Sequence, residues 1–219
     1  MDREVRPSLR FAMVCASNMN RSMESHALLQ KRGFNVWSFG TGANVKLPGT
    51  APDKPIVYNF RVPYREIYEE LRAQNEEYFR NASVLPMLER NMAVKPAPER
   101  WQDREASRQH FDVVVSFEER VFEAILEDCQ QREPVDFELM HVINLEVRDT
   151  YADAAEGAVL ALHLCELLEA ALQSRADSGR YSEPVLMDSG HDASDPVERV
   201  LYAFEDRTGR RLLYSPQYS

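Results

Sequence analysis

The sequence contains little of several features that would place it in other classes of protein. Its 219 residues include three cysteines, Cys15, Cys129 and Cys165, too few and too scattered for a disulfide framework or a zinc cluster. No apolar run approaches the roughly 20 residues needed to cross a bilayer. The start, Met1-Asp2-Arg3-Glu4, does not resemble a secretory signal. We therefore expect a reducing compartment and no membrane contact.

Basic residues are scarce relative to acidic ones. The chain has 26 lysines and arginines against 36 aspartates and glutamates, and its net charge of −10 argues against general binding to nucleic acid. The chain has five histidines: His26, His110, His141, His163 and His191. They show no spacing typical of metal ligands, so we expect no metal and no cofactor. Hydrophobic residues, in contrast, are abundant: they make up 44% of the chain, enough for a substantial core.

Short apolar segments alternate with stretches of helical periodicity. The expected strands are Leu9–Cys15, Asn35–Thr41, Asp112–Phe117 and His141–Val147. The expected helices between and after them are Ser22–Arg32, Glu118–Arg132 and Ala152–Gln173. This alternation predicts an α/β fold, in which helices cover both faces of a parallel sheet.

Two regions interrupt the alternation. Residues 43–100 begin with a loop rich in proline and glycine and continue with two expected helices, Tyr64–Tyr78 and Ser83–Asn91. A segment this long between strands is typical of a lid or a binding surface. Residues 174–196 are polar and resemble a linker, and 197–210 again show helical spacing. We interpret residues 1–219 as one domain with a cap-like insertion, a polar linker and a C-terminal helix.

The most informative motif follows the first expected strand. Cys15 is followed six residues later by Arg21 and then by Ser22, where a helix is expected to begin. A five-residue loop can curl so that its amides point inward and hold an anion, and the helix N-terminus adds positive potential. Arg21 can clamp two phosphate oxygens, and the same field favours a thiolate at Cys15. The predicted phosphate-binding residues are Ala16, Ser17, Asn18, Met19, Asn20, Arg21 and Ser22.

Each member of this motif also has an ordinary structural interpretation. Cys15 could be a small buried residue at a strand end, and Arg21 a surface residue of a helix. The context favours chemistry, because a strand precedes the motif, a helix follows it, and the second strand ends in Gly40-Thr41-Gly42. Asn18 suits a left-handed position in such a loop.

Phosphate ester cleavage also requires an acid that protonates the leaving oxygen. Functional residues of parallel sheets lie beyond the carboxyl ends of the strands. The fourth expected strand delivers Asp149 to that edge, just before a long helix. Asp149 is therefore the candidate acid, although an aspartate before a helix can also be only a cap, with Asp153 as a competitor.

At this point the chain resembles a known family. The loop and the position of the acid resemble the low-molecular-weight tyrosine phosphatase fold. Further stretches resemble one family within that fold, the phosphatases of the heptad-repeat tail of RNA polymerase II. These stretches are Cys15–Glu24, Lys31–Phe34, Ser38–Gly42, Val45–Gly49, Ala51–Pro55, Lys95–Arg100, Glu118–Val121 and His141–Asn144.

The resemblance implies a three-layer sandwich around a four-stranded parallel sheet of order 2-1-3-4, with the insertion forming a substrate groove. It assigns the nucleophile to Cys15, the phosphate arginine to Arg21 and the general acid to Asp149. It implies a substrate with phosphoserine before a cis proline, held by Lys46, Leu47, Pro48, Gly49 and Met87. Without the resemblance, Leu47-Pro48-Gly49 would be interpreted as an ordinary turn.

The resemblance also implies partners and a location. The partners are the phosphorylated polymerase tail and a helical-repeat scaffold of the cleavage and polyadenylation machinery, and the location is the nucleus, with the cytoplasm as a second compartment. Two alternatives stay open. One is a scaffold-binding subunit with a secondary catalytic role, whose docking surface could be Glu118–Cys129. The other is an arsenate reductase, which would need resolving thiols near Cys15 that Cys129 and Cys165 do not offer by spacing.

Overall fold

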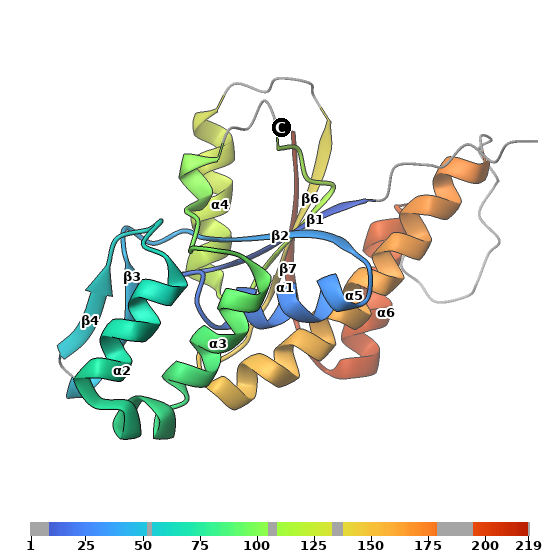
Figure 1. Cartoon of the computed structure of the whole chain (residues 1–219). Helices are drawn as coiled ribbons and strands as arrows, with labels where there is room; N and C mark the ends of the chain where they lie inside the picture. Colours follow the sequence, from blue (N-terminus) through green and yellow to red (C-terminus); the bar gives the residue numbers. More distant parts are fainter. Residues whose placement is uncertain (1–8, 52–53, 105–108, 133–137, 179–194, 219) are drawn as a thin grey trace, which may run out of the picture.

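The structure is a computed structural model, and it describes residues 9–51, 54–104, 109–132, 138–178 and 195–218. In chain order its elements are β1 (Arg10–Cys15), α1 (Arg21–Lys31), β2 (Asn35–Gly40), β3 (Val45–Ala51), β4 (Lys54–Tyr58), α2 (Tyr64–Asn81), α3 (Val84–Val94), the 3₁₀ turn η1 (Trp101–Asp103), β5 (Val113–Ser116), α4 (Glu119–Gln131), β6 (Leu139–Leu145), α5 (Tyr151–Ser178), α6 (Pro196–Thr208) and β7 (Leu212–Tyr218). Figure 1 shows their arrangement.

The central sheet places the carboxyl ends of its parallel strands at one edge. Its order is β2-β1-β5-β6-β7, in which the first four strands are parallel and β7 is antiparallel to β6. Cys15 ends β1 opposite Gly40 of β2, and Val14 pairs with Ser116 at the end of β5. The loops after β1, β5 and β6 therefore meet at the same edge, where the sequence predicts the chemistry.

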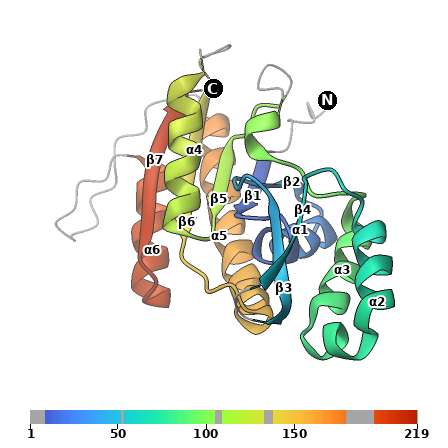
Figure 2. The same cartoon turned by 90° about the vertical axis from the view of Figure 1, so that its left-hand side faces the viewer.

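Alternation along β1 decides which way its side chains point. Phe11, Met13 and Cys15 join the core formed with α1, α5 and α6, whereas Ala12 and Val14 join the core formed with α4. Figure 2 shows α4 on one side of the sheet and α5 and α6 on the other. The three-layer α/β architecture expected from the sequence is thereby confirmed. Burial of β1 on both faces fixes the position from which the Cys15 thiol emerges.

The insertion between β2 and β5 has a hydrophobic core of its own. Its antiparallel hairpin, β3 and β4, packs with α2 and α3, and the largest fully buried side chains there are Tyr64, Phe79 and Ile67. Met19 and Met23, from the loop after β1 and from α1, belong to the same core. The insertion is therefore packed directly against the region that carries Cys15, as Figures 1 and 2 show.

Three expectations are corrected by the structure. The sheet has five strands rather than four, because Leu212–Tyr218 adds an antiparallel edge strand beside β6. The segment 45–58 is a hairpin rather than a loop, with an irregular register between Leu47 and Ala51. The long helix α5 continues to Ser178, so it occupies the beginning of the expected linker.

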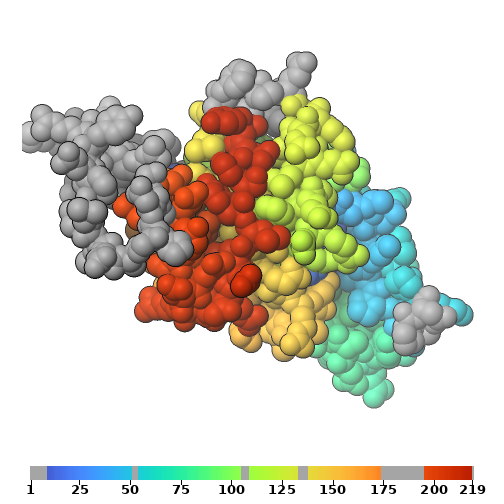
Figure 3. Space-filling model, turned by 180° about the vertical axis from the view of Figure 1, so that it is seen from behind, coloured from blue at the N-terminus to red at the C-terminus, as the bar shows by residue number. Residues whose placement is uncertain are grey.

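The rest of that linker, 179–194, lies outside the described residues. After it, Asp195 caps α6 by accepting a hydrogen bond from the Val197 amide at 2.9 Å. Seen from behind, α6 and β7 form a surface on the side away from the insertion (Figure 3). Among the helices that the structure describes, none is long and apolar enough to cross a membrane. The division into one domain with a cap-like insertion stays a prediction.

Candidate active site

The loop after β1 presents the Cys15 thiol to a hydroxyl that can donate to it. Cys15 is 3% exposed, and its Sγ lies 3.0 Å from the Oγ of Ser22, in the first turn of α1. Asn18 Nδ2 donates to the same Ser22 Oγ at 3.1 Å. Because that oxygen already accepts a hydrogen bond from Asn18, its own proton is available to Cys15.

The backbone of the loop turns its carbonyl groups away from the centre. The Cys15 and Ala16 carbonyls accept from the Thr41 and Gly42 amides at 3.0 and 2.9 Å, and the Asn18 carbonyl accepts from the Tyr64 hydroxyl at 2.7 Å. Asn18 itself has a φ of 52°, in the left-handed region, as predicted from the sequence. Within the described part of the chain, no protein acceptor takes the amides of residues 16–20. These amides are therefore available to an oxyanion.

Gly40 is required for this close packing. A Cβ at Gly40 would lie 2.8 Å from both the Ala16 carbonyl oxygen and the Asn18 amide nitrogen. Both contacts are with backbone atoms, which cannot move without moving the loop. A glycine is therefore required at Gly40, the last residue of β2.

Arg21 is fixed by the ends of two other strands. Its Nη1 donates to the carbonyls of Phe117 and Val147 at 3.1 and 2.9 Å, and its Nη2 donates to Glu118 Oε2 at 2.8 Å. The side chain is 4% exposed, yet its Nε has no hydrogen-bond partner. The Nε proton faces Asp149 Oδ1 at 3.4 Å without a hydrogen bond, so it remains for an oxyanion that displaces this contact.

The charges around Arg21 keep it protonated. Burial opposes the charged form, but Cys15, Asp149 and Glu118 outweigh burial, so the pKa of Arg21 is raised. Burial also opposes the charged form of Glu118, yet the hydrogen bonds from Arg21 and Arg120 leave the pKa of Glu118 below its usual value. The pair is therefore ionised at neutral pH.

Asp149 is joined to the loop rather than acting only as a cap. Asn20 Nδ2 donates to Asp149 Oδ1 at 3.0 Å and to the Thr150 carbonyl at 3.1 Å. Asp149 Oδ1 also lies 3.4 Å from Arg21 Nε. The hydroxyl of Thr150, not Asp149, caps α5 by accepting from the Asp153 amide at 3.0 Å. Asp149 is 58% exposed and can reach a substrate that approaches from solvent.

The predicted groove residues lie on the insertion beside this loop. The Lys46 amide donates to Ser17 Oγ at 3.2 Å, which joins β3 to the loop. Lys46 and Pro48 are exposed, whereas Leu47 and Met87 are buried in the insertion core, at 3% and 6% exposure. Gly49 is needed where it stands, since a Cβ there would lie 1.9 Å from the Lys54 carbonyl oxygen. The role of these residues in substrate binding stays a prediction.

Several residues of the site have no predicted role in the sequence analysis. They are Glu118, which holds Arg21; Glu99, whose amide donates to Asn18 Oδ1; Tyr64; and Arg90 and Asn91, which contact the loop from α3. Glu99 and Glu118 do stand in stretches that carry the family resemblance, which was a usable signal. The other three side chains donate to backbone carbonyls of the loop, and a contact with a backbone carbonyl cannot be predicted from a sequence pattern.

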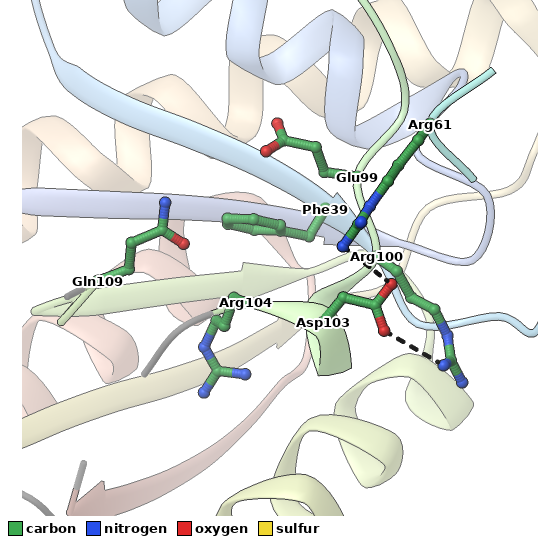
Figure 4. Close-up of a pocket in the computed structure, with 7 residues that line it drawn as sticks. All are labelled: Phe39, Arg61, Glu99, Arg100, Asp103, Arg104 and Gln109. Atoms are coloured by element: carbon green, nitrogen blue, oxygen red, sulfur yellow. Dashed lines mark ion pairs between the residues drawn. The ribbon is translucent and has the colours of Figure 1, made fainter. Parts of the chain in front are cut away.

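A depression beside the site does not contain Cys15. Seven residues line it (Figure 4): Phe39, Arg61, Glu99, Arg100, Asp103, Arg104 and Gln109. Asp103 lies between Arg61 and Arg100, at 3.7 and 3.6 Å, and forms an ion pair with each. Among the described residues, no group of three His, Cys, Asp or Glu side chains could hold a metal ion.

Comparisons with known proteins identify the family of the chain. A family profile described as Ssu72-like protein matches residues 9–219. The RNA polymerase II C-terminal domain phosphatases SSU72 of Xenopus laevis and Homo sapiens are 40% and 39% identical to the chain over 207 residues, covering 94% of it and 95% of each relative. A crystal structure of Drosophila melanogaster Ssu72 with Symplekin and a cis peptidomimetic phosphoserine peptide has a TM-score of 0.81 and 35% identity, covering 97% of this chain and all of that one. The chain belongs to the Ssu72-like protein family.

Proposed function

We propose that this protein is a cysteine-dependent phosphatase that removes phosphate from phosphoserine in the C-terminal tail of RNA polymerase II. The observation that carries the proposal is the convergence of Cys15, Arg21 and Asp149 around one loop whose amides have no protein acceptor, with the Nε of Arg21 not hydrogen-bonded. The names of the relatives support the substrate. The proposal thus rests on chemistry in this chain and on the family for specificity.

In the first step the Cys15 thiolate attacks phosphorus and the bond to the serine oxygen breaks. The loop amides and Arg21 stabilise the equatorial oxygens, where charge spreads in the transition state. Asp149 gives its proton to the departing serine oxygen, which leaves as the neutral hydroxyl. The products are the serine side chain and a cysteinyl-phosphate.

In the second step water replaces the sulfur. Asp149, now a carboxylate, takes a proton from the attacking water, and the S–P bond breaks to release inorganic phosphate. The sulfur leaves as a thiolate, and the Ser22 hydroxyl at 3.0 Å is placed to donate to it. Both steps use the same carboxyl, which explains why Asn20 holds Asp149 against the loop.

The substrate proposal extends to a cis proline after the phosphoserine. A cis Ser-Pro bond is a minority state, and selecting it costs about 1–2 kcal/mol of binding free energy. The exposed Lys46 and Pro48 of β3 are beside the loop, where a peptide that doubles back would lie. The cis peptidomimetic bound to the Drosophila protein supports this choice.

The decisive experiment uses phosphorylated heptad peptides. Cys15→Ser should abolish turnover, vanadate should inhibit the wild-type protein, and EDTA should not; turnover by Cys15→Ser would refute the mechanism. Peptides with proline locked cis or trans test the groove separately. Equal rates on the two would remove the cis proposal and leave the catalytic one intact.

A second role, as a subunit of a larger assembly, is favoured by the Symplekin complex of the Drosophila protein. We propose that a helical-repeat scaffold of the cleavage and polyadenylation machinery docks on the outer face of α4, within Glu118–Cys129, and that the protein acts in the nucleus. A charge reversal at the exposed Glu123 should weaken scaffold capture while leaving peptide turnover unchanged. Unchanged capture would move the docking surface elsewhere.

A further inference from the structure

The last turns of α3 reach across to the catalytic loop. Arg90 Nη2 donates to the Met19 carbonyl at 2.7 Å and to the Asn20 carbonyl at 3.3 Å. Asn91 Nδ2 donates to the same Met19 carbonyl at 2.8 Å. Three donor contacts from one helix of the insertion thus hold two successive carbonyl groups of the loop.

Holding these carbonyls decides where the following amides point. In a planar trans peptide unit, the C=O of one residue and the N–H of the next point in opposite directions. When the Met19 carbonyl is held outward, the amide of Asn20 faces the other way. The Asn20 carbonyl also accepts from the Glu24 amide of α1 at 2.9 Å, so Arg90 adds to a helical hydrogen bond that already turns the amide of Arg21. A rotated peptide plane would instead present a carbonyl oxygen to the phosphate, which repels an anion.

The two side chains are themselves firmly held. Arg90 is 14% exposed and pairs through Nη1 with Glu24 of α1, and Asn91 is fully buried. Asn91 Oδ1 accepts from Arg90 Nε and Nη2 at 3.0 and 2.8 Å, which fixes the guanidinium in its plane. Such mutual support restricts the rotamers of both residues, so little conformational entropy is left to lose on ligand binding.

The structure assigns a positioning role to Arg90 and Asn91: they lock the peptide planes after Met19 and Asn20, so that the insertion sets the affinity of the loop for phosphate. This inference rests on the proposed function. It makes α3 the link between the two parts of the site, because Met87, one turn before Arg90, packs in the insertion core with Leu47 of β3. A shift of α3 would move the predicted groove and the loop amides together.

The test compares Arg90→Met with Arg80→Met. Arg80 belongs to the same insertion but is 45% exposed and pairs with the surface residues Glu76, Glu89 and Tyr68, so its substitution should leave vanadate affinity and turnover unchanged. Orthovanadate affinity is measured by calorimetry on the folded proteins, together with kcat and KM on a phosphoserine peptide. Loss of charge-assisted contacts to two carbonyls should weaken vanadate binding by roughly tenfold to a hundredfold and lower kcat more than KM.

A merely structural role would lower the melting temperature and leave the vanadate affinity of the folded protein unchanged. Arg90→Lys provides the second variant, because it keeps the charge but cannot span both carbonyls and Glu24 with one ammonium group. We expect it to bind vanadate severalfold more weakly than wild type. Affinity within twofold of wild type in a folded Arg90 variant would overturn the inference. If wild type neither binds vanadate nor turns over peptide, the proposed function itself fails.

Discussion

His26 offers a test of the packing behind the catalytic loop. It lies on α1, 5% exposed, and its Nδ1 is 2.8 Å from Ser38 Oγ of β2. Burial, assisted by the charge of Lys95, lowers the pKa of His26 to about 4 from an ordinary 6.5. The folded protein therefore keeps this ring neutral at pH values where the unfolded chain protonates it.

The sign and size of the effect follow from proton linkage. Between pH 6.5 and about 4 the unfolded state binds more protons at His26, so stability falls as the pH is lowered through this window. Going from pH 7 to pH 5 should remove about 2 kcal/mol from the free energy of unfolding through this residue alone. The loss should be complete below about pH 3 and nearly absent above pH 7.

The assay is urea unfolding at pH 7 and pH 5 for wild type and His26→Gln. The variant loses stability at both pH values because its packing differs, but it lacks the titrating ring. Wild type should therefore lose about 2 kcal/mol more than the variant between the two pH values. Equal losses in the two proteins, within the error of extrapolation, would refute the assignment of a buried neutral ring.

Three further predictions concern the site. Gly40→Ala should destabilise the protein by about 1–3 kcal/mol and weaken vanadate binding, because the new methyl group meets the loop backbone; unfolding and calorimetry measure both. Asn20→Ala should slow turnover of phosphoserine peptides more than that of an aryl phosphate, since only a poor leaving group needs the proton of Asp149. A constant ratio of the two rates would contradict this. Peroxide should inactivate the protein with poor recovery by thiols, because residues 16–22 of the loop contain no second cysteine that could protect oxidised Cys15 as a disulfide; full recovery after reductant would count against it.

The parallel strands could be predicted because burial on both faces leaves a clear apolar signature in the sequence, whereas their order was implied only by the family resemblance. β7 could not, since its sequence, Leu-Leu-Tyr-Ser-Pro-Gln-Tyr, contains a proline that is tolerated only because the strand lies at an edge. The hairpin of the insertion was hidden by Pro48 and Gly49, which favour a turn but here occupy an irregular stretch of β3. Local sequence patterns do not show that the tertiary structure tolerates proline and glycine at these positions.

The site, like the fold, contains residues that local sequence patterns predict and residues that only tertiary contacts identify. Cys15, Arg21 and Asn18 could be predicted because the loop concentrates its chemistry in eight consecutive residues. The position of Asp149 could be predicted because functional residues of parallel sheets lie beyond the carboxyl ends of the strands. The supports around them, Arg90 foremost, act on backbone carbonyls from about 70 residues away. No spacing rule connects such partners, and only the folded arrangement identifies them.

The antiparallel strand at the sheet edge has a practical consequence for engineering. β6, which leads to Asp149, has β5 on one side and β7 on the other. Truncation before Leu212 would remove β7 and leave the backbone amides and carbonyls of β6 unpaired on that side. An unpaired edge strand can form hydrogen bonds with another copy of the protein and so promotes aggregation. We therefore expect that a fusion partner or affinity tag that displaces β7 from the sheet will lower both solubility and activity, and that one attached away from β7 will not.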